Sequence, residues 1–171
     1  MPQTLGVHLV KSAFGQWLPG DPRGHWSTAW DEKLGHVEPH TLHEGDPVRQ
    51  RMAAERMQHP SVSWTPAMIE SIATTLERCA DESPWNIAAL AIEPTHLHAL
   101  IIYASLDFDR TTKWLAQQMT KAVHAETSHA GPVFAKGKWA TFVFDQPHWD
   151  NTARYIQHHP GHRPTNKKDR G

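Results

Sequence analysis

NIAALAIEPTHLHALIIY, residues 86–103, is the stretch of the chain that decides the fold. Two short apolar segments, 86–92 and 96–103, flank the turn Glu93-Pro94-Thr95, and this arrangement is typical of a β-hairpin. Both segments have the length and apolar content of buried strands. The sequence therefore predicts a pair of antiparallel strands just past the middle of the chain.

Helices and single strands are predicted on both sides of this hairpin. Thr65 and Pro66 are typical of an N-cap followed by a first-turn proline. The helix that begins there, 66–81, repeats apolar residues at helical spacing, namely Met68, Ile72, Leu76 and Cys79. A helix over 107–127 has a similar inward face, made of Phe108, Leu115, Met119, Ala122 and Val123. The remaining elements are strands over 5–11 and 139–144, a weakly amphipathic helix over 47–58, and a last helix from near Pro147 to before Pro160.

Apart from the helix over 47–58, the order of these elements is strand, helix, two strands, helix, strand, helix. That order favours an α+β fold, a ferredoxin-like (RRM-like) antiparallel sheet with helices packed on one face. We expect one domain over 1–160, with a long insertion at about 15–60, and a basic C-terminal tail over 161–171. The insertion begins with GQWLPGDPRG, residues 15–24, whose glycines and prolines are incompatible with regular structure.

Composition excludes several classes of protein. A chain of 171 residues is long enough for one sizeable core. Cys79 is the only cysteine, so neither an internal disulfide nor a cysteine-rich zinc site can form. No apolar run approaches the roughly 20 residues of a membrane helix, and the N-terminal residues lack the pattern of a signal peptide. We expect a cytoplasmic protein without a membrane partner.

Charge is distributed unevenly along a nearly neutral chain. Residues 1–103 carry 7 Lys and Arg against 12 Asp and Glu, whereas residues 104–171 carry 10 against 6. The positive second part would attract a polyanion, although a solvated surface has the same pattern.

Two histidines in the second strand of the hairpin form the sharpest local motif. Because strand side chains alternate between faces, His96 and His98 point the same way, about 7 Å apart along the strand. Two imidazoles on one face can hold a divalent ion and leave positions open for phosphate oxygens. The alternative is a pair of histidines on the solvent side of a half-buried strand.

The last helix, HWDNTARYIQHHP, carries a second group of polar residues. Asn151, Tyr155 and His159 stand four residues apart, on a different face from the apolar residues Trp149, Ala153 and Ile156. Such spacing can bring a phenol and a third metal ligand over the same part of the sheet, whereas a half-buried tyrosine at the helix edge is the alternative. The other tyrosine, Tyr103, is predicted to face away from the two strand histidines.

These residues resemble a known family, the single-tyrosine HUH transposases. PTHLHAL, followed about 57 residues later by RYIQHHP, is similar to the HUH motif and tyrosine helix of insertion-sequence-200-like transposases, with REP-associated tyrosine transposases as the nearest branch. GQWLPGDPRG is similar to a GTWLPGD-type segment of some bacterial members. The resemblance extends from the first strand to Pro160.

The resemblance implies a fold of the HUH endonuclease type and a set of functional residues. It implies Mg²⁺ or Mn²⁺ at His96 and His98, a third ligand at His159 and the nucleophile at Tyr155. It also implies single-stranded, hairpin-containing DNA as the partner and leaves open whether the protein is a monomer or a homodimer. The chain departs from the family at His159, where asparagine or glutamine is common, and in its acidic segment at 27–46.

Three functions follow as hypotheses. The leading one is a metal-dependent endonuclease and strand transferase on single-stranded DNA that forms a 5′-phosphotyrosine intermediate. The second is a catalytically inactive or domesticated nucleic-acid-binding protein of the same fold. The third is a histidine-triad-like small-molecule phosphohydrolase, although Leu100 stands where that motif has another histidine.

Candidate DNA contacts lie on two of the predicted helices. A polar stripe opposite the apolar face of the helix at 107–127 consists of Lys113, Gln117, Lys121 and His124. Its lysines can hold backbone phosphates, and Arg154 beside Tyr155 is a further candidate. A solvated helix face is the alternative interpretation of the stripe.

Overall fold

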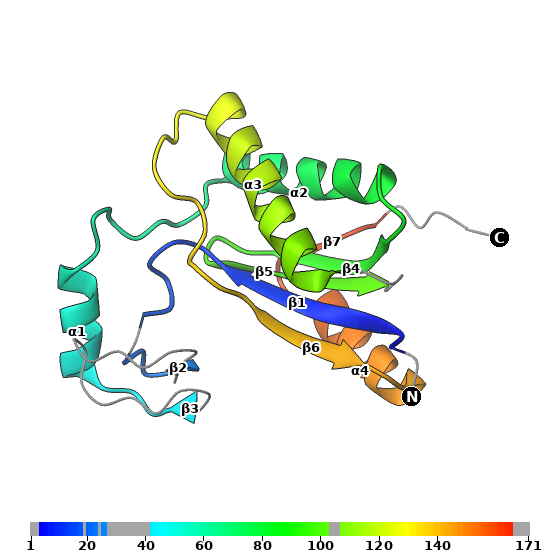
Figure 1. Cartoon of the computed structure of the whole chain (residues 1–171), viewed down its shortest axis with the longest axis horizontal. Coiled ribbons are helices and arrows are strands. Elements are labelled where there is room, and N and C mark those ends of the chain that lie inside the picture. Colours follow the sequence, from blue (N-terminus) through cyan, green and yellow to red (C-terminus); the bar gives the residue numbers. More distant parts are fainter. Residues whose placement is uncertain (1–3, 19, 24, 27–41, 103–106, 166–171) are drawn as a thin grey trace.

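An antiparallel sheet of five strands forms the centre of the computed structural model, which describes residues 4–18, 20–23, 25–26, 42–102 and 107–165 (Figure 1). In chain order the elements are β1 (Gly6–Ser12), β2 (His25–Trp26), β3 (Leu42–His43), α1 (Pro47–Glu55), α2 (Pro66–Asp81), β4 (Asn86–Ile92), β5 (His96–Ile102), α3 (Phe108–Glu126), β6 (Trp139–Val143), α4 (Gln146–Gln157) and β7 (His162–Arg163). Tyr103 and the segments 27–41 and 166–171, including most of the predicted basic tail, lie outside the described residues.

The strand order confirms the predicted fold class. The sheet runs β6-β1-β5-β4-β7, with every neighbouring pair antiparallel. Helix α2 connects β1 to β4, and α3 connects β5 to β6, so each helix crosses over a strand that lies between the two it joins. This interleaving of two split β-α-β units is the ferredoxin-like arrangement.

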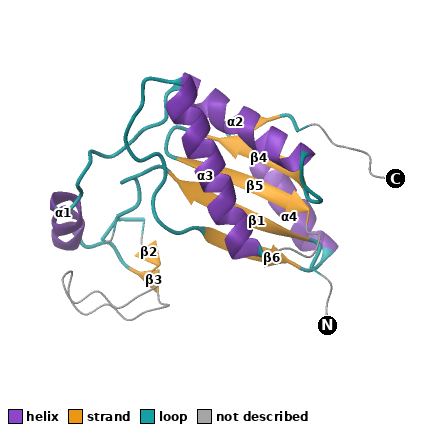
Figure 2. Ribbon diagram, turned by 45° about the horizontal axis from the view of Figure 1, so that its top comes forward, coloured by secondary structure: helices purple, strands orange, loops and turns teal. Residues whose placement is uncertain are grey.

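Helices cover both faces of the sheet, and the two faces have different cores. Helices α2 and α3 pack on one face, as predicted, and α4 lies on the other (Figure 2). The larger core is on the α2–α3 face, where Leu97, Ala99 and Ile101 of β5 point. The smaller core lies under α4 and contains Leu100 of β5 and Ile156 of α4. Alternation along β5 therefore turns His96 and His98 toward α4.

The helices begin where the sequence predicts them to begin. Thr65 caps α2 by accepting a hydrogen bond from the backbone N–H of Met68, and Pro66 follows in the first turn. Asp107 and Asp145 cap α3 and α4 in the same way. A side-chain acceptor at each start satisfies backbone N–H groups that have no partner within the helix.

Three short strands were not predicted. Strands β2 and β3 form a separate two-stranded sheet, which stands with α1 away from the main sheet (Figure 1). Strand β7 pairs with β4 at the edge of the main sheet, so residues 162–163 belong to the sheet. In front of β7, Gly161 accepts a hydrogen bond from the backbone N–H of Ile92 at 2.8 Å. A Cβ atom at position 161 would lie 2.3 Å from the Ile92 carbonyl oxygen, so the close approach requires glycine.

Within the described residues, no helix is both long enough and apolar enough to cross a membrane.

Candidate metal and nucleophile site

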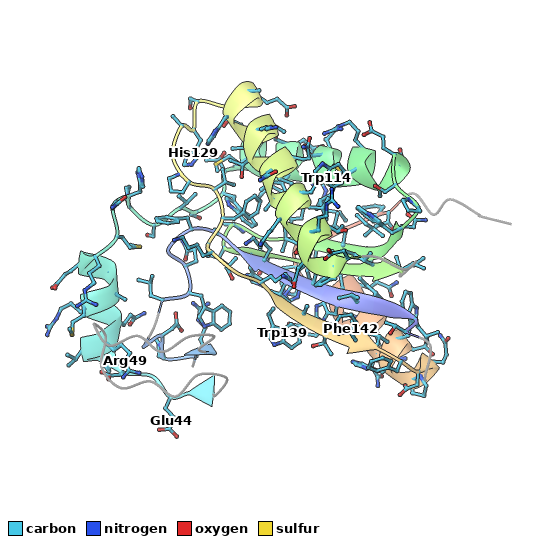
Figure 3. The ribbon with its side chains drawn as sticks, viewed as in Figure 1. Glu44, Arg49, Trp114, His129, Trp139 and Phe142 are labelled. Atoms are coloured by element: carbon cyan, nitrogen blue, oxygen red, sulfur yellow. The ribbon has the colours of Figure 1, made fainter. Side chains whose placement is uncertain are left out.

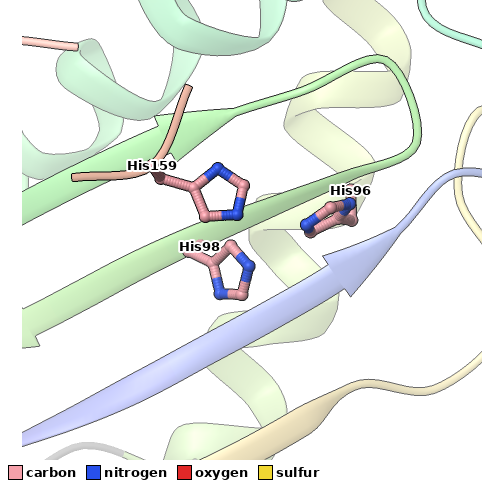
Figure 4. Close-up of side chains that lie close together, drawn as sticks. All are labelled: His96, His98 and His159. Atoms are coloured by element: carbon pink, nitrogen blue, oxygen red, sulfur yellow. The ribbon is translucent and has the colours of Figure 1, made fainter. Parts of the chain in front are cut away.

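Three histidines meet between β5 and the end of α4. His96 and His98 come from β5, on the face that the alternation of the strand predicts. His159 follows α4 in the chain, and its ring points toward the two strand rings (Figure 4). One nitrogen of each ring can be chosen so that all three lie within 4.8 Å of one another. Such a cluster has the ligand type and spacing of a site for one metal ion.

His159 reaches this position from a turn and not from the helix. Helix α4 ends at Gln157, and His158 is its C-cap. The backbone N–H of His159 donates to the carbonyl of Ile156 at 3.1 Å, and the N–H of His162 donates to the carbonyl of His159 at 3.0 Å. The tight turn, followed by β7, therefore places the ring over β5.

The hydrogen bonds of the strand histidines are made through Nδ1, so their Nε2 atoms are the nitrogens available to the cluster. The Nδ1 of His98 lies 3.0 Å from the Nε2 of His8 on β1, and the Nδ1 of His96 lies 2.9 Å from the Thr95 hydroxyl. Partners of this kind fix the ring orientation and tautomer of metal-binding histidines. The His98 Nε2 and the His159 Nδ1 are buried without a hydrogen-bond partner among the described residues. Buried imidazole nitrogens that make no hydrogen bond fit a divalent metal.

Sequence reasoning missed His8, which touches the centre of the site. Its ring stacks on that of His98 with a centroid distance of 5.2 Å, and it also contacts Trp139 and Tyr155. The available signal was a polar residue in the middle of the apolar strand GVHLVKS. A single polar residue does not identify its partner, because the pairing of β1 with β5 joins segments about 90 residues apart.

Burial keeps these imidazoles neutral. Desolvation, with smaller contributions from His8, His96 and His159, lowers the pKa of His98 to about 3. Desolvation and the nearby His148 lower the pKa of His8 to about 4. The pKa of His96 is also lowered, mainly by desolvation and against the opposing effect of Glu93. Neutral imidazole is the form that binds metal.

These pKa shifts predict a pH-dependent stability of the metal-free protein. Between the folded pKa values of about 3 and 4 and the unfolded value of 6.5, the unfolded chain binds protons that the native His98 and His8 do not bind. The contribution of these groups to the free energy of unfolding is therefore fully present above pH 6.5 and decreases as the pH is lowered toward 5. We expect Tm, measured with a chelator present, to decrease over this range. The decrease should be shallower in His8→Gln, and a constant Tm in the wild type would contradict the assignment.

Tyr155 stands beside the histidine cluster and faces solvent. Its side chain is 54% exposed, and its ring centroid lies 5.4 Å from that of His98 and 5.9 Å from that of His159. On a different side of α4, Ile156 is buried, and Trp149 and Ala153 pack against the same small core. Tyr155 therefore lies apart from the apolar face of its helix, as predicted. A solvent-facing phenol is accessible to a large substrate.

An open depression of about 540 Å³ adjoins Tyr155 along the end of α4. It is lined by Asn151, Arg154, Tyr155, His158, His159 and Pro160. The Arg154 guanidinium, which donates a hydrogen bond to the Asn151 amide oxygen at 3.4 Å, brings positive charge to the depression. The end of α4 thus joins a cation, a phenol and a candidate metal ligand on one surface.

The other candidate DNA contacts lie elsewhere. Lys113, Gln117 and Lys121 are exposed on α3, which covers the face of the sheet opposite to the histidines (Figure 2). The structure brings Arg154 to the site and does not bring the α3 residues to it. DNA binding at the α3 stripe stays a prediction about a different surface.

An exposed tryptophan borders the site on the other side. Trp139 begins the edge strand β6, where it is 52% exposed (Figure 3). It is paired with Val10 of β1, on the same face as His8, and its ring contacts that of His8 edge-on at 5.4 Å. Exposed indole rings are surfaces on which unpaired bases stack.

Comparisons with known proteins return one distant structural likeness. No family model and no curated protein matches the chain. A solved structure of a REP-associated tyrosine transposase bound to a REP hairpin aligns with a TM-score of 0.43 and 12% sequence identity, over 91% of this chain and 67% of that one.

Proposed function

We propose that the protein is a metal-dependent endonuclease and strand transferase acting on single-stranded DNA, with Tyr155 as its nucleophile. The observation that carries this proposal is the contact between an exposed phenol and a cluster of three histidines, in which the ring of Tyr155 lies 5.4 Å from that of His98. The two components have different roles in cleavage of a phosphodiester, and either alone would be insufficient.

The histidine cluster supplies the electrostatic part of the chemistry. His96, His98 and His159 would hold one divalent ion, Mg²⁺ or Mn²⁺. When bound, such an ion polarises the scissile phosphate and neutralises the charge that develops on it. A phenol has an ordinary pKa near 10 and is a weak nucleophile at neutral pH, so it needs an activated phosphate.

Tyr155 supplies the bond-forming part. Its Oη attacks the phosphorus, the bond from phosphorus to the 3′-oxygen of the upstream nucleotide breaks, and the 5′ end of the downstream strand becomes attached to the tyrosine. The phenolic proton leaves to water, which reaches the exposed side chain, and the departing 3′-oxygen takes a proton from water. The phosphotyrosine conserves the energy of the phosphodiester, so a 3′-hydroxyl can attack it and rejoin strands.

The surface around Tyr155 favours an unpaired nucleic-acid strand. Arg154 can contact phosphates on one side, and Trp139 can stack on a base on the other. Both side chains are exposed and lie on the face of the sheet that carries the histidines. An unpaired strand offers the bases that a duplex keeps stacked inside.

The test is covalent trapping. The protein is incubated with Mn²⁺ and a labelled single-stranded oligonucleotide that contains a hairpin, then denatured. We expect a protein–DNA adduct that survives denaturation and whose label maps to the peptide containing Tyr155. Binding without an adduct would favour the inactive nucleic-acid-binding alternative, and hydrolysis of a small phosphate ester without DNA cleavage would favour the phosphohydrolase.

Salt dependence tests the proposed binding of phosphates. Arg154→Gln should weaken binding to all sequences and flatten the slope of log affinity against log salt by about 0.7, the value for one phosphate of a single strand that is no longer neutralised. Neutralising Lys113 and Lys121 together should flatten the slope by about 0.7 for each phosphate that the two lysines hold. The control is Arg51→Gln on α1, an exposed cation away from both surfaces. An unchanged slope in the lysine variant would identify the α3 stripe as a solvated surface.

A further inference from the structure

A carboxylate lies between two of the three histidines. Glu93 is in the turn of the β4–β5 hairpin, with one carboxylate oxygen 3.6 Å from the Nε2 of His96 and the other 3.4 Å from the Nδ1 of His159. The side chain of Glu93 is 24% exposed, and those of the two histidines are 20% and 12% exposed. The carboxylate is therefore part of the partly buried cluster and not a solvated surface group.

The two distances are too long for ordinary hydrogen bonds. An N–H···O hydrogen bond spans about 2.7–3.2 Å, and the His159 Nδ1 has no hydrogen-bond partner among the described residues. Two donors that bind one ion with bonds of about 2.1 Å in tetrahedral geometry lie about 3.4 Å apart. Each of these two nitrogens thus lies, from a different oxygen of Glu93, at close to the spacing of ligands that share an ion.

Two elements hold Glu93 in this place. Its backbone N–H donates to the carbonyl of His96 at 2.8 Å, which closes the hairpin turn. Its neighbour Ile92 is hydrogen-bonded to Gly161, which follows the turn that carries His159. A Cβ atom at position 161 would also lie 2.9 Å from the Glu93 Cγ, so the glutamate side chain packs directly against that turn.

We propose that Glu93 is a fourth protein ligand, so that the site is a three-histidine, one-carboxylate centre. This inference rests on the metal site of the proposed function. Three neutral imidazoles contribute no charge, whereas a carboxylate offsets half of the charge of a divalent ion in a partly buried site.

A fourth protein ligand changes which metal supports cleavage. Zn²⁺ prefers four ligands, and a zinc site with four protein ligands is closed to substrate. Mn²⁺ accepts six, so two positions stay open for phosphate oxygens. Zinc should therefore bind tightly and inhibit cleavage that manganese supports.

The test measures metal binding without DNA. Zn²⁺ and Mn²⁺ are titrated calorimetrically into the wild type, Glu93→Gln and the control Glu126→Gln, which changes an exposed glutamate at the end of α3. Loss of an outer-sphere partner typically weakens metal binding by about 10–100-fold. We expect Glu93→Gln to weaken zinc binding by more than about 100-fold and Glu126→Gln to leave it unchanged. A loss of about 100-fold or less in Glu93→Gln would overturn the proposal.

A second variant distinguishes the effect of the carboxylate charge from the effect of side-chain length. Glu93→Asp keeps the carboxylate but shortens the side chain by one methylene, so a direct ligand should lose affinity as it does in Glu93→Gln. Wild-type zinc affinity in Glu93→Asp would contradict direct ligation. In the cleavage assay, zinc should compete with manganese in the wild type and lose its inhibition in Glu93→Gln. A wild-type protein that binds zinc through Glu93 but never cleaves DNA would refute the proposed function alone, and cleavage that is indifferent to Glu93 would refute this inference alone.

Discussion

Replacing Tyr155 by phenylalanine should abolish formation of the protein–DNA adduct, with a fall in cleavage rate of at least about 10⁴-fold, the order expected when a covalent nucleophile is removed. The change deletes one oxygen and almost no volume. Because the side chain is 54% exposed and the buried face of α4 is formed by other residues, folding and DNA affinity should be unchanged. The measurements are the rate of cleavage of a labelled hairpin oligonucleotide and its affinity in the presence of Mn²⁺.

The matched control for this variant is Tyr103→Phe, since the chain has two tyrosines. It should cleave at the wild-type rate and form the same adduct. An adduct in Tyr155→Phe, or a label that maps to another peptide in the wild type, would refute the role of Tyr155. Loss of DNA binding in Tyr155→Phe would instead assign the phenol to substrate binding.

Removal of the two strand histidines should eliminate metal binding. His96→Ala/His98→Ala deletes two of three clustered imidazoles, and we expect the affinity for Mn²⁺ to fall by more than about 100-fold, beyond the effect of losing an outer-sphere partner. Cleavage should disappear with it. In the wild type, Mn²⁺ should support faster cleavage than Mg²⁺, because imidazole is a better ligand for manganese.

A second pair of neighbouring histidines provides the control. The ring centroids of His124 and His129 lie 6.1 Å apart near the end of α3. Each ring is hydrogen-bonded to a backbone carbonyl of the loop that follows α3. Their double replacement by alanine should leave metal affinity unchanged. Calorimetry that finds equal manganese affinity in His96→Ala/His98→Ala and the wild type would show that the metal binds elsewhere or not at all.

The regular elements were predictable because their signals are local. The apolar spacing of 66–81, the cap at Thr65 and the hairpin around Glu93 each lie within one segment, and the observed bounds of α2, β4 and β5 agree with them to within one residue. Strands β2, β3 and β7 have two residues each, too few for any periodic pattern. Their existence depends on pairing with distant segments.

The residues of the site that lie in local motifs could be predicted from the sequence. Those that only the tertiary structure brings to the site could not. His96 and His98 share a face because strand side chains alternate, so their proximity follows from sequence. His159 was assigned to a helix but approaches them from a turn. His8 and Glu93 enter the site only through the pairing of β1 with β5 and through the approach of Gly161 to Ile92. Contacts between segments that are distant in the sequence have no characteristic residue spacing, so the sequence alone does not reveal them.

The pairing of β7 with β4 determines when the histidine cluster can be completed during synthesis of the chain. A ribosome completes β1, β4 and β5 well before it adds residues 158–163, so a nascent chain has His96 and His98 but not the turn that presents His159. A domain generally folds as a unit during synthesis. His159 would then arrive as the final described strand closes the edge of the sheet, and a growing chain could not complete the three-histidine cluster before that closure.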